Sequence, residues 1–124
     1  MAEEKAEKIV YISTHGAEDP ERASLPFVLA NAALVMEVDA VVALQGASVF
    51  LAKKGMLEHV HSAGFAPLKE LVDSFLDLGG RLLVCVPCIQ ERRIDIEDLI
   101  EKAVPTAGGA LTEEFLSANA TLVY

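Results

Sequence analysis

The sequence predicts an α/β fold in which helices cover both faces of a mainly parallel sheet of about five strands. Short apolar segments rich in β-branched residues alternate along the chain with segments of helical periodicity. No two apolar segments are joined by the short turn of a hairpin, so consecutive strands need crossover connections and run parallel. The chain of 124 residues suits one domain, and we expect a single domain over residues 1–124.

The first strand and the first helix are predicted between Lys8 and about Glu37. Lys8 to Ser13 is a short apolar run, typical of a buried strand. Asp19 and Pro20 form a helix-start signal, because an Asp side chain caps the first turn and Pro suits the first helical position. Pro26 lies inside the predicted helix, so we expect a kink there or a later start.

The middle of the chain predicts a second strand and a second long helix. Asp39 to Leu44 is the second apolar run, and a short helical piece is expected from Val49 to Lys54. Met56 to Phe65 has no clean period and is expected to be a loop or a mobile segment. The next helix opens at Pro67, has apolar residues three or four apart, and ends at Gly79, where a positive φ costs little.

The last third of the chain predicts further strands in alternation with short helices. The strands are Arg81 to Val86, Val104 to Ala107 and Thr121 to Tyr124, and the helices are Ile96 to Lys102, capped by Asp95, and Leu111 to Ala118. The third strand is the one that carries the thiols of the chain to the edge of the sheet.

Composition and charge exclude several classes of protein. Apolar residues make up 52% of the chain and the mean hydropathy is +0.38, which argues against disorder and indicates further burial between subunits. The net charge of −9 argues against nucleic acid and anionic lipid as partners. No apolar run reaches the ~18 residues of a membrane helix. The charged start, Met1 to Lys8, has no apolar signal core, and we expect a cytoplasmic protein.

Both cysteines of the chain follow the third predicted strand. Cys85 ends the apolar run, Cys88 comes three residues later, and Arg92 and Arg93 follow. A thiolate is the reactive form of cysteine, and its free pKa is about 8.5. A helix N-terminus, the arginines and the second thiol could each lower the pKa of Cys85. The competing interpretation is that Cys85 is a small core residue, since free cysteines are often buried.

The Cys-x-x-Cys spacing leaves a dithiol redox pair as an alternative. Its context differs from the thioredoxin motif, which opens a helix near the start of its domain. A closed zinc site would need a second such pair, and the chain has none. We therefore expect no metal and no cofactor.

The histidines are weaker candidates. His15 and Gly16 lie in the turn after the first strand, where a His could act as an acid–base group or could be a surface residue. His59 and His61 lack a third ligand, and we interpret them as solvated or interfacial.

These residues resemble the DsrE/DsrF-like family, which includes the YchN-like and TusD-like proteins. The resemblance covers almost the whole chain. It rests on the Thr14-His15-Gly16 turn, the Asp19-Pro20-Glu21-Arg22 helix start, the Asp39 to Gly46 and Gly80 to Val86 strands, and the Leu111 to Tyr124 end. Its most specific piece is Cys85-x-x-Cys88 followed by Arg92 and Ile94. The resemblance implies a flavodoxin-like three-layer α/β/α sandwich, assembly as homotrimers or homohexamers, and a cysteine that carries a persulfide.

The sequence thus predicts a sulfur carrier of sulfurtransferase type that passes a persulfide between a donor and an acceptor protein. Cys85 and Cys88 are the predicted catalytic thiols, and Arg92, His15 and Gly16 would bind or stabilise an anion. The alternative is a non-catalytic oligomeric module, for assembly or small-ligand binding, whose thiols are structural.

Overall fold

The computed structural model describes residues 6–124, and within them five parallel strands form one sheet in the order β4-β3-β2-β1-β5. The strands are β1 (Lys8–Ser13), β2 (Asp39–Leu44), β3 (Arg81–Cys85), β4 (Ala103–Thr106) and β5 (Ala120–Val123). The first five residues of the segment Met1 to Lys8, on which the expectation of a cytoplasmic protein depends, lie outside the described part.

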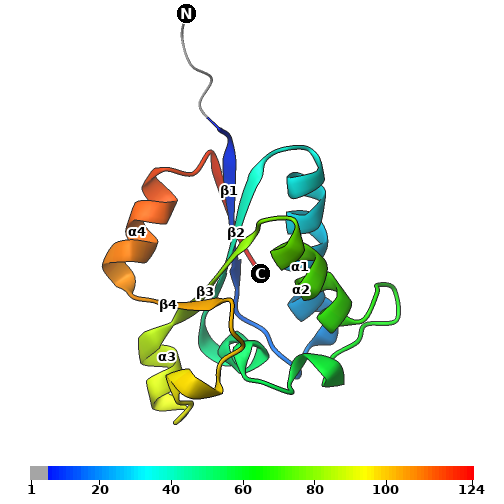
Figure 1. The fold of residues 1–124 in the computed structure, drawn as a ribbon, viewed down its shortest axis with the longest axis vertical. Helices are drawn as coiled ribbons and strands as arrows, with labels where there is room; N and C mark the ends of the chain where they lie inside the picture. The colour runs from blue at the N-terminus through cyan, green and yellow to red at the C-terminus, as the bar shows by residue number, and fades with distance from the viewer. Residues whose placement is uncertain (1–5) are drawn as a thin grey trace, which may run out of the picture.

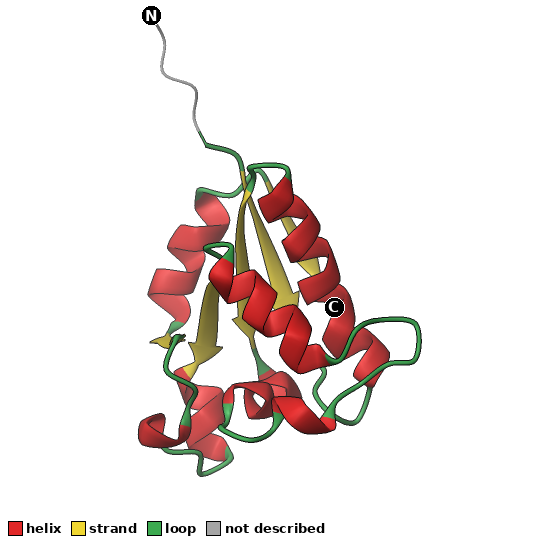
Figure 2. Ribbon diagram, turned by 45° about the vertical axis from the view of Figure 1, so that its right-hand side comes forward, coloured by secondary structure: helices red, strands yellow, loops and turns green. Residues whose placement is uncertain are grey.

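Helices cover both faces of the sheet, which confirms the predicted α/β/α sandwich. Helices α1 (Pro20–Val35) and α2 (Leu68–Asp77) lie on one face, and α4 (Gly108–Leu116) lies on the other (Figure 1). The short helix α3 (Val86–Glu91) and the 3-10 turns η1 (Gly46–Ala52), η2 (Leu57–His59) and η3 (Ile96–Asp98) gather at the end toward which the strand arrows point (Figure 2). This is the edge where ligands bind in open α/β sheets.

The face under α1 and α2 holds the larger core. Phe27 of α1 and Phe75 of α2 are fully buried and meet edge to face, with ring centroids 5.5 Å apart at 82°. Such aromatic pairs add about 0.5–1.5 kcal/mol beyond the area they bury. The opposite core is smaller and is closed by Leu111 of α4, which packs over Val10, Val41 and other residues of the three central strands.

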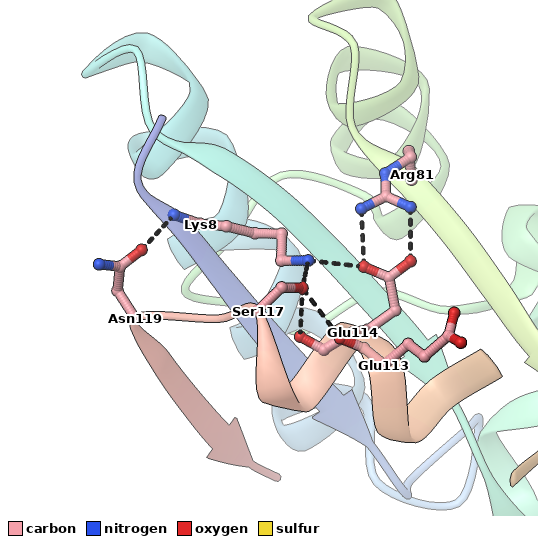
Figure 3. Close-up of polar contacts among 6 residues, drawn as sticks. All are labelled: Lys8, Arg81, Glu113, Glu114, Ser117 and Asn119. Carbon is pink, nitrogen blue, oxygen red and sulfur yellow. Dashed lines mark hydrogen bonds and ion pairs between the residues drawn. The ribbon is translucent and has the colours of Figure 1, made fainter. Parts of the chain in front are cut away.

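The α4 face keeps much apolar surface exposed. Leu116 is 82% exposed and Val123 is 70% exposed, and Val104 also faces solvent. Polar contacts hold α4 to the sheet: the Glu114 carboxylate accepts hydrogen bonds from Lys8 and Arg81, and Lys8 also donates to Ser117 (Figure 3). No helix within residues 6–124 is both long and apolar enough to cross a membrane.

Several predicted boundaries were wrong. Helix α1 starts at Pro20, continues through Pro26, and ends at Val35, because Glu37 takes a φ of 63°. The helix predicted from Ile96 to Lys102 is only the single 3-10 turn η3, and the Asp95 side chain does not cap it. The chain after this turn pairs instead with the segment after η1: the Lys54 N–H donates to the Asp98 carbonyl and the Ile100 N–H to the Ala52 carbonyl.

The last helix also has other bounds than those predicted. Gly108 begins α4, so this helix starts earlier than the predicted Leu111 and ends at Leu116. At the end of α2, Gly79 has a φ of 94°, as the sequence predicted for a helix terminus. The strand that carries the first cysteine ends at Cys85 itself, and α3 begins at the next residue.

Candidate functional site

Strand β3 delivers Cys85 to the carboxyl edge of the sheet. The strand residues Leu82, Leu83 and Val84 are buried, and Cys85 is the first residue of the strand that is half-buried. Helix α3 begins directly after it, with Pro87 in the first turn, where a missing N–H costs nothing. The chain therefore changes from strand to helix at the thiol, as the sequence predicted.

Cys85 opens into a pocket of about 220 Å³. The ends of β2 and β4 and the start of α4 supply the other walls, through Gln45, Thr106, Gly108 and Leu111. Because these residues come from neighbouring parallel strands, their carboxyl ends meet at one edge. The pocket has room for several water molecules, each of which takes ~30 Å³ in the liquid, and hence for the end of a side chain that reacts with Cys85.

The surroundings raise the pKa of the Cys85 thiol. Burial is the largest cause, because it disfavours the thiolate, and a hydrogen bond with the Cys88 side chain acts in the same direction. The Cys88 backbone N–H and the Arg92 guanidinium lower the pKa of Cys85, but by less. The helix start and the arginine that the sequence suggested would lower the pKa of Cys85 are present, but burial raises this pKa by more than they lower it.

Cys88 lies one helical turn further on and is held by a second loop. Gly46, which follows β2, donates its backbone N–H to Cys88 Sγ at 3.4 Å. The buried Ser48 hydroxyl fixes this loop, since it accepts from the Gln45 N–H at 2.9 Å and donates to the Ser13 carbonyl at 2.6 Å. Both cysteines are free thiols.

Arg92 lies beside the two thiols. Its Nη1 donates to the Cys88 carbonyl at 3.2 Å, and its side chain is 27% exposed. Its ion pair with Glu91 is loose, at 3.8 Å from Nη1 to Oε2. Arg92 therefore keeps part of its charge for an anion at the thiols.

His15 and Gly16 lie at the same edge but apart from the thiol pocket, which they do not line. The Gly16 N–H already donates to the Glu18 carboxylate, at 2.5 Å to Oε1, and His15 Nδ1 is 3.8 Å from Glu18 Oε2. A Cβ on Gly16 would lie 2.8 Å from the Ala47 carbonyl oxygen, so this glycine allows a close backbone contact. The structure thus brings together Cys85, Cys88 and Arg92, and it does not bring His15 or Gly16 to them.

Sequence reasoning missed Gln45, Gly46 and Thr106 as neighbours of the thiols. Gln45 and Gly46 follow the end of β2, and Thr106 ends β4. Both strands are neighbours of β3 in the sheet. The signal that could have found them is the strand order, which places the residues after β2 and β4 on either side of Cys85.

A larger hollow of about 480 Å³ lies elsewhere, between α2 and the segment before β4. Exposed charged residues of both signs line it, including Lys53, Asp73 and Lys102, and it holds no thiol.

The side chain of His61 makes a local contact: its Nε2 lies 2.9 Å from the Phe65 carbonyl oxygen, within hydrogen-bond distance. Among residues 6–124 no group of three or more His, Cys, Asp or Glu side chains is placed to hold a metal.

Comparisons with known proteins connect this fold to a family. Residues 7–124 match the model of the DsrE/DsrF-like family. The uncharacterized protein MJ0760 of Methanocaldococcus jannaschii is 29% identical over 113 residues, which are 91% of this chain and 41% of that protein. This chain therefore spans less than half the length of that relative.

Two solved structures share the architecture. The ychN protein from E. coli aligns with a TM-score of 0.80 at 19% identity, over 95% of this chain and 99% of that chain. Protein MTH1491 of unknown function from Methanobacterium thermoautotrophicum aligns with a TM-score of 0.74 at 14% identity, over 97% of this chain and 100% of that chain. At these identities the likeness supports the fold alone.

Proposed function

This chain belongs to the DsrE/DsrF-like family, and from that premise we propose that it is a sulfur carrier of sulfurtransferase type. The observation that carries the proposal is the position of Cys85, whose thiol opens into a pocket at the carboxyl edge of the sheet. The Cys88 N–H and the Arg92 guanidinium both favour its thiolate. Family membership adds support, because the family includes sulfur-relay proteins.

The proposed reaction is a pair of thiol exchanges at sulfur. The Cys85 thiolate attacks the outer sulfur of a donor persulfide, a new S–S bond forms, and the donor leaves as a thiolate. An acceptor thiolate then attacks the outer sulfur on Cys85 and takes it, so that Cys85 returns to the thiolate. No external oxidant or reductant is consumed, because each step exchanges one S–S bond for another.

Mass spectrometry of the intact protein tests this proposal. The reduced protein is mixed with inorganic polysulfide, desalted and weighed, and we expect a gain of one sulfur atom per chain. The Cys85→Ser variant is the matched control, because Ser is of similar size and cannot hold the sulfur. If neither the wild type nor a Cys88→Ser variant gains sulfur, or if Cys85→Ser gains as much as the wild type, Cys85 is not the carrier.

The raised pKa of Cys85 favours the alternative function. A thiol whose pKa is raised forms less of the reactive thiolate, which suits a non-catalytic assembly or small-ligand-binding module with structural thiols. The rate of polysulfide loading at neutral pH distinguishes the two functions. Loading within minutes supports the carrier, and no loading over hours supports the module.

We further propose that the protein is a cytoplasmic homotrimer or homohexamer that meets donor and acceptor proteins in turn. The exposed apolar side chains on the α4 face, Val104, Leu116 and Val123, supply the motive, because such a patch marks an interaction surface. Sedimentation at micromolar concentration tests the assembly, and a stable monomer would contradict it.

A further inference from the structure

The two thiols have different relations to solvent and to the protein. Cys85 lines the pocket of about 220 Å³, and among the described residues Cys88 does not line it. Both cysteines are half-buried and pack against the larger core, and Cys88 Sγ accepts the N–H of Gly46 at 3.4 Å. A reactant that enters through the pocket therefore meets Cys85 first.

The two sulfurs are placed to react with each other. Cys85 caps α3 and Cys88 is the third residue of that helix, so the two side chains lie on the same side of its first turn. The two thiols are near enough for Cys88 to raise the pKa of Cys85. The Gly46 N–H donates to Cys88 Sγ at 3.4 Å and holds this sulfur in the first turn of α3, beside Cys85.

We propose that Cys88 is a resolving thiol, which converts a persulfide on Cys85 into a Cys85–Cys88 disulfide and releases sulfide. This inference rests on the proposed function. The Cys88 thiolate, its proton given to solvent, attacks Cys85 Sγ. A bond forms between the two cysteine sulfurs, the bond from Cys85 Sγ to the outer sulfur breaks, and the outer sulfur leaves as hydrosulfide with the bonding electrons.

The step is balanced without an external oxidant. The outer sulfur is reduced to sulfide, and the two cysteines are oxidised to a disulfide. A dithiol reductant must then restore the two thiols before the next cycle. Transfer to an acceptor thiol and internal release compete for the same persulfide, so the protein delivers free sulfide whenever no acceptor occupies the pocket. A reaction that consumes sulfide is the class that would use this product.

The experiment follows sulfide and protein mass after loading. Reduced protein receives a short pulse of inorganic polysulfide, is desalted, and is incubated without reductant while sulfide is measured by a colorimetric assay. For the wild type we expect about one sulfide per loaded chain and a final mass two hydrogen atoms below that of the reduced protein. For Cys88→Ser we expect the extra sulfur to persist, with sulfide release slower by roughly tenfold or more, because the attack from within one site is lost.

Controls separate this inference from the proposed function. Ser at position 88 can still accept the Gly46 N–H, and Cys88→Ala provides a second variant that lacks the nucleophile; thermal unfolding checks that both fold. If neither wild type nor Cys88→Ser gains sulfur, the proposed function fails. If both gain sulfur and lose it at equal rates, the carrier stands and the resolving role of Cys88 is overturned. A disulfide that forms without release of sulfide overturns it as well.

Discussion

Arg81 and Glu114 form a bidentate ion pair between β3 and α4, in which Arg81 Nη1 lies 2.7 Å from Glu114 Oε2 and Arg81 Nη2 lies 2.8 Å from Glu114 Oε1 (Figure 3). Lys8 of β1 donates to the same carboxylate at 2.8 Å. Arg81 starts the strand that ends in Cys85, and α4 starts with Gly108 in the wall of the thiol pocket. The ion pair therefore fixes the helix that closes one side of the pocket.

We predict that the Glu114→Gln variant loses stability at neutral pH and loses it less steeply in acid than the wild type. The hydrogen bonds from Arg81, then those from Lys8, lower the pKa of Glu114 to about 2 from its ordinary value of 4.5. A carboxylate whose folded pKa is depressed stabilises the protein above its unfolded pKa, and this contribution is lost as the pH falls from about 4.5 toward 2. Urea unfolding of the wild type and of Glu114→Gln at a series of pH values measures this contribution to the free energy of unfolding.

The expected loss in the free energy of unfolding at neutral pH is about 1.5–3 kcal/mol, the range for hydrogen bonds to a charged group. Glu113→Gln is the matched control, because Glu113 is the exposed neighbour on the same helix and its substitution should change stability by no more than ~0.5 kcal/mol. Equal acid dependence of the wild type and Glu114→Gln would show that this ion pair does not stabilise the fold.

We predict that Gly80→Ala destabilises the protein by about 1–3 kcal/mol, the usual cost of overpacking a core. A Cβ at Gly80 would lie 2.3 Å from Cε1 of Phe75, whose ring is fully buried against Phe27 and cannot move aside without disturbing that pair. Gly64→Ala is the control, because its Cβ would meet no atom within 4 Å. Thermal unfolding of both variants measures the difference, and equal midpoints would contradict the prediction.

Most of the fold follows from the sequence because its strands and long helices have strong local patterns. The apolar run of β2 and the amphipathic α2 are each fixed by residues within the element. The errors fall where tertiary contacts decide. Pro26 lies inside α1 with its side chain buried, and the packing of the helix offsets the hydrogen bond that its missing N–H cannot form. Gly108 begins a helix because α4 is anchored by Leu111 and Glu114.

The candidate site could be predicted only in part. The local run from Cys85 to Arg92 lies on one strand and one helix, so spacing alone brings its members together. Gly46 lies 42 residues from Cys88, and only the pairing of β2 with β3 brings them close. The same limit explains the pKa of Cys85, because nearby positive groups can be read from sequence, whereas burial depends on the whole fold.

We predict that alkylation of Cys85 needs a higher pH than an ordinary cysteine thiol requires. Burial is the largest cause that raises its pKa and is kept in Cys88→Ser, and only the thiolate reacts with iodoacetamide. The rate of labelling in Cys88→Ser, where Cys85 is the remaining thiol, is measured from pH 6 to pH 10 by mass spectrometry and compared with the unfolded chain in urea. A midpoint at or below that of the unfolded chain would contradict the burial argument.

The last prediction concerns Arg92, whose charge lowers the pKa of Cys85 against these larger effects. The Arg92→Met variant keeps most of the side-chain length and removes the positive charge, so the pH profile of Cys85 alkylation should move to higher pH. At pH values where the thiol is fully ionised, the rates of variant and wild type should converge, because only the ionised fraction changes. Arg92→Lys should stay close to the wild type, since the positive charge remains.

Arg93→Met is the matched control, because Arg93 is the adjacent, exposed arginine and is not among the groups that shift the pKa of Cys85. Loss of the hydrogen bond from Arg92 to the Cys88 carbonyl should also cost about 0.5–1.5 kcal/mol of stability, so all profiles are recorded well below the unfolding temperature. A slower rate for Arg92→Met at every pH, including full ionisation, would indicate altered access to the pocket. Coincident profiles for Arg92→Met and the wild type would remove Arg92 from the site.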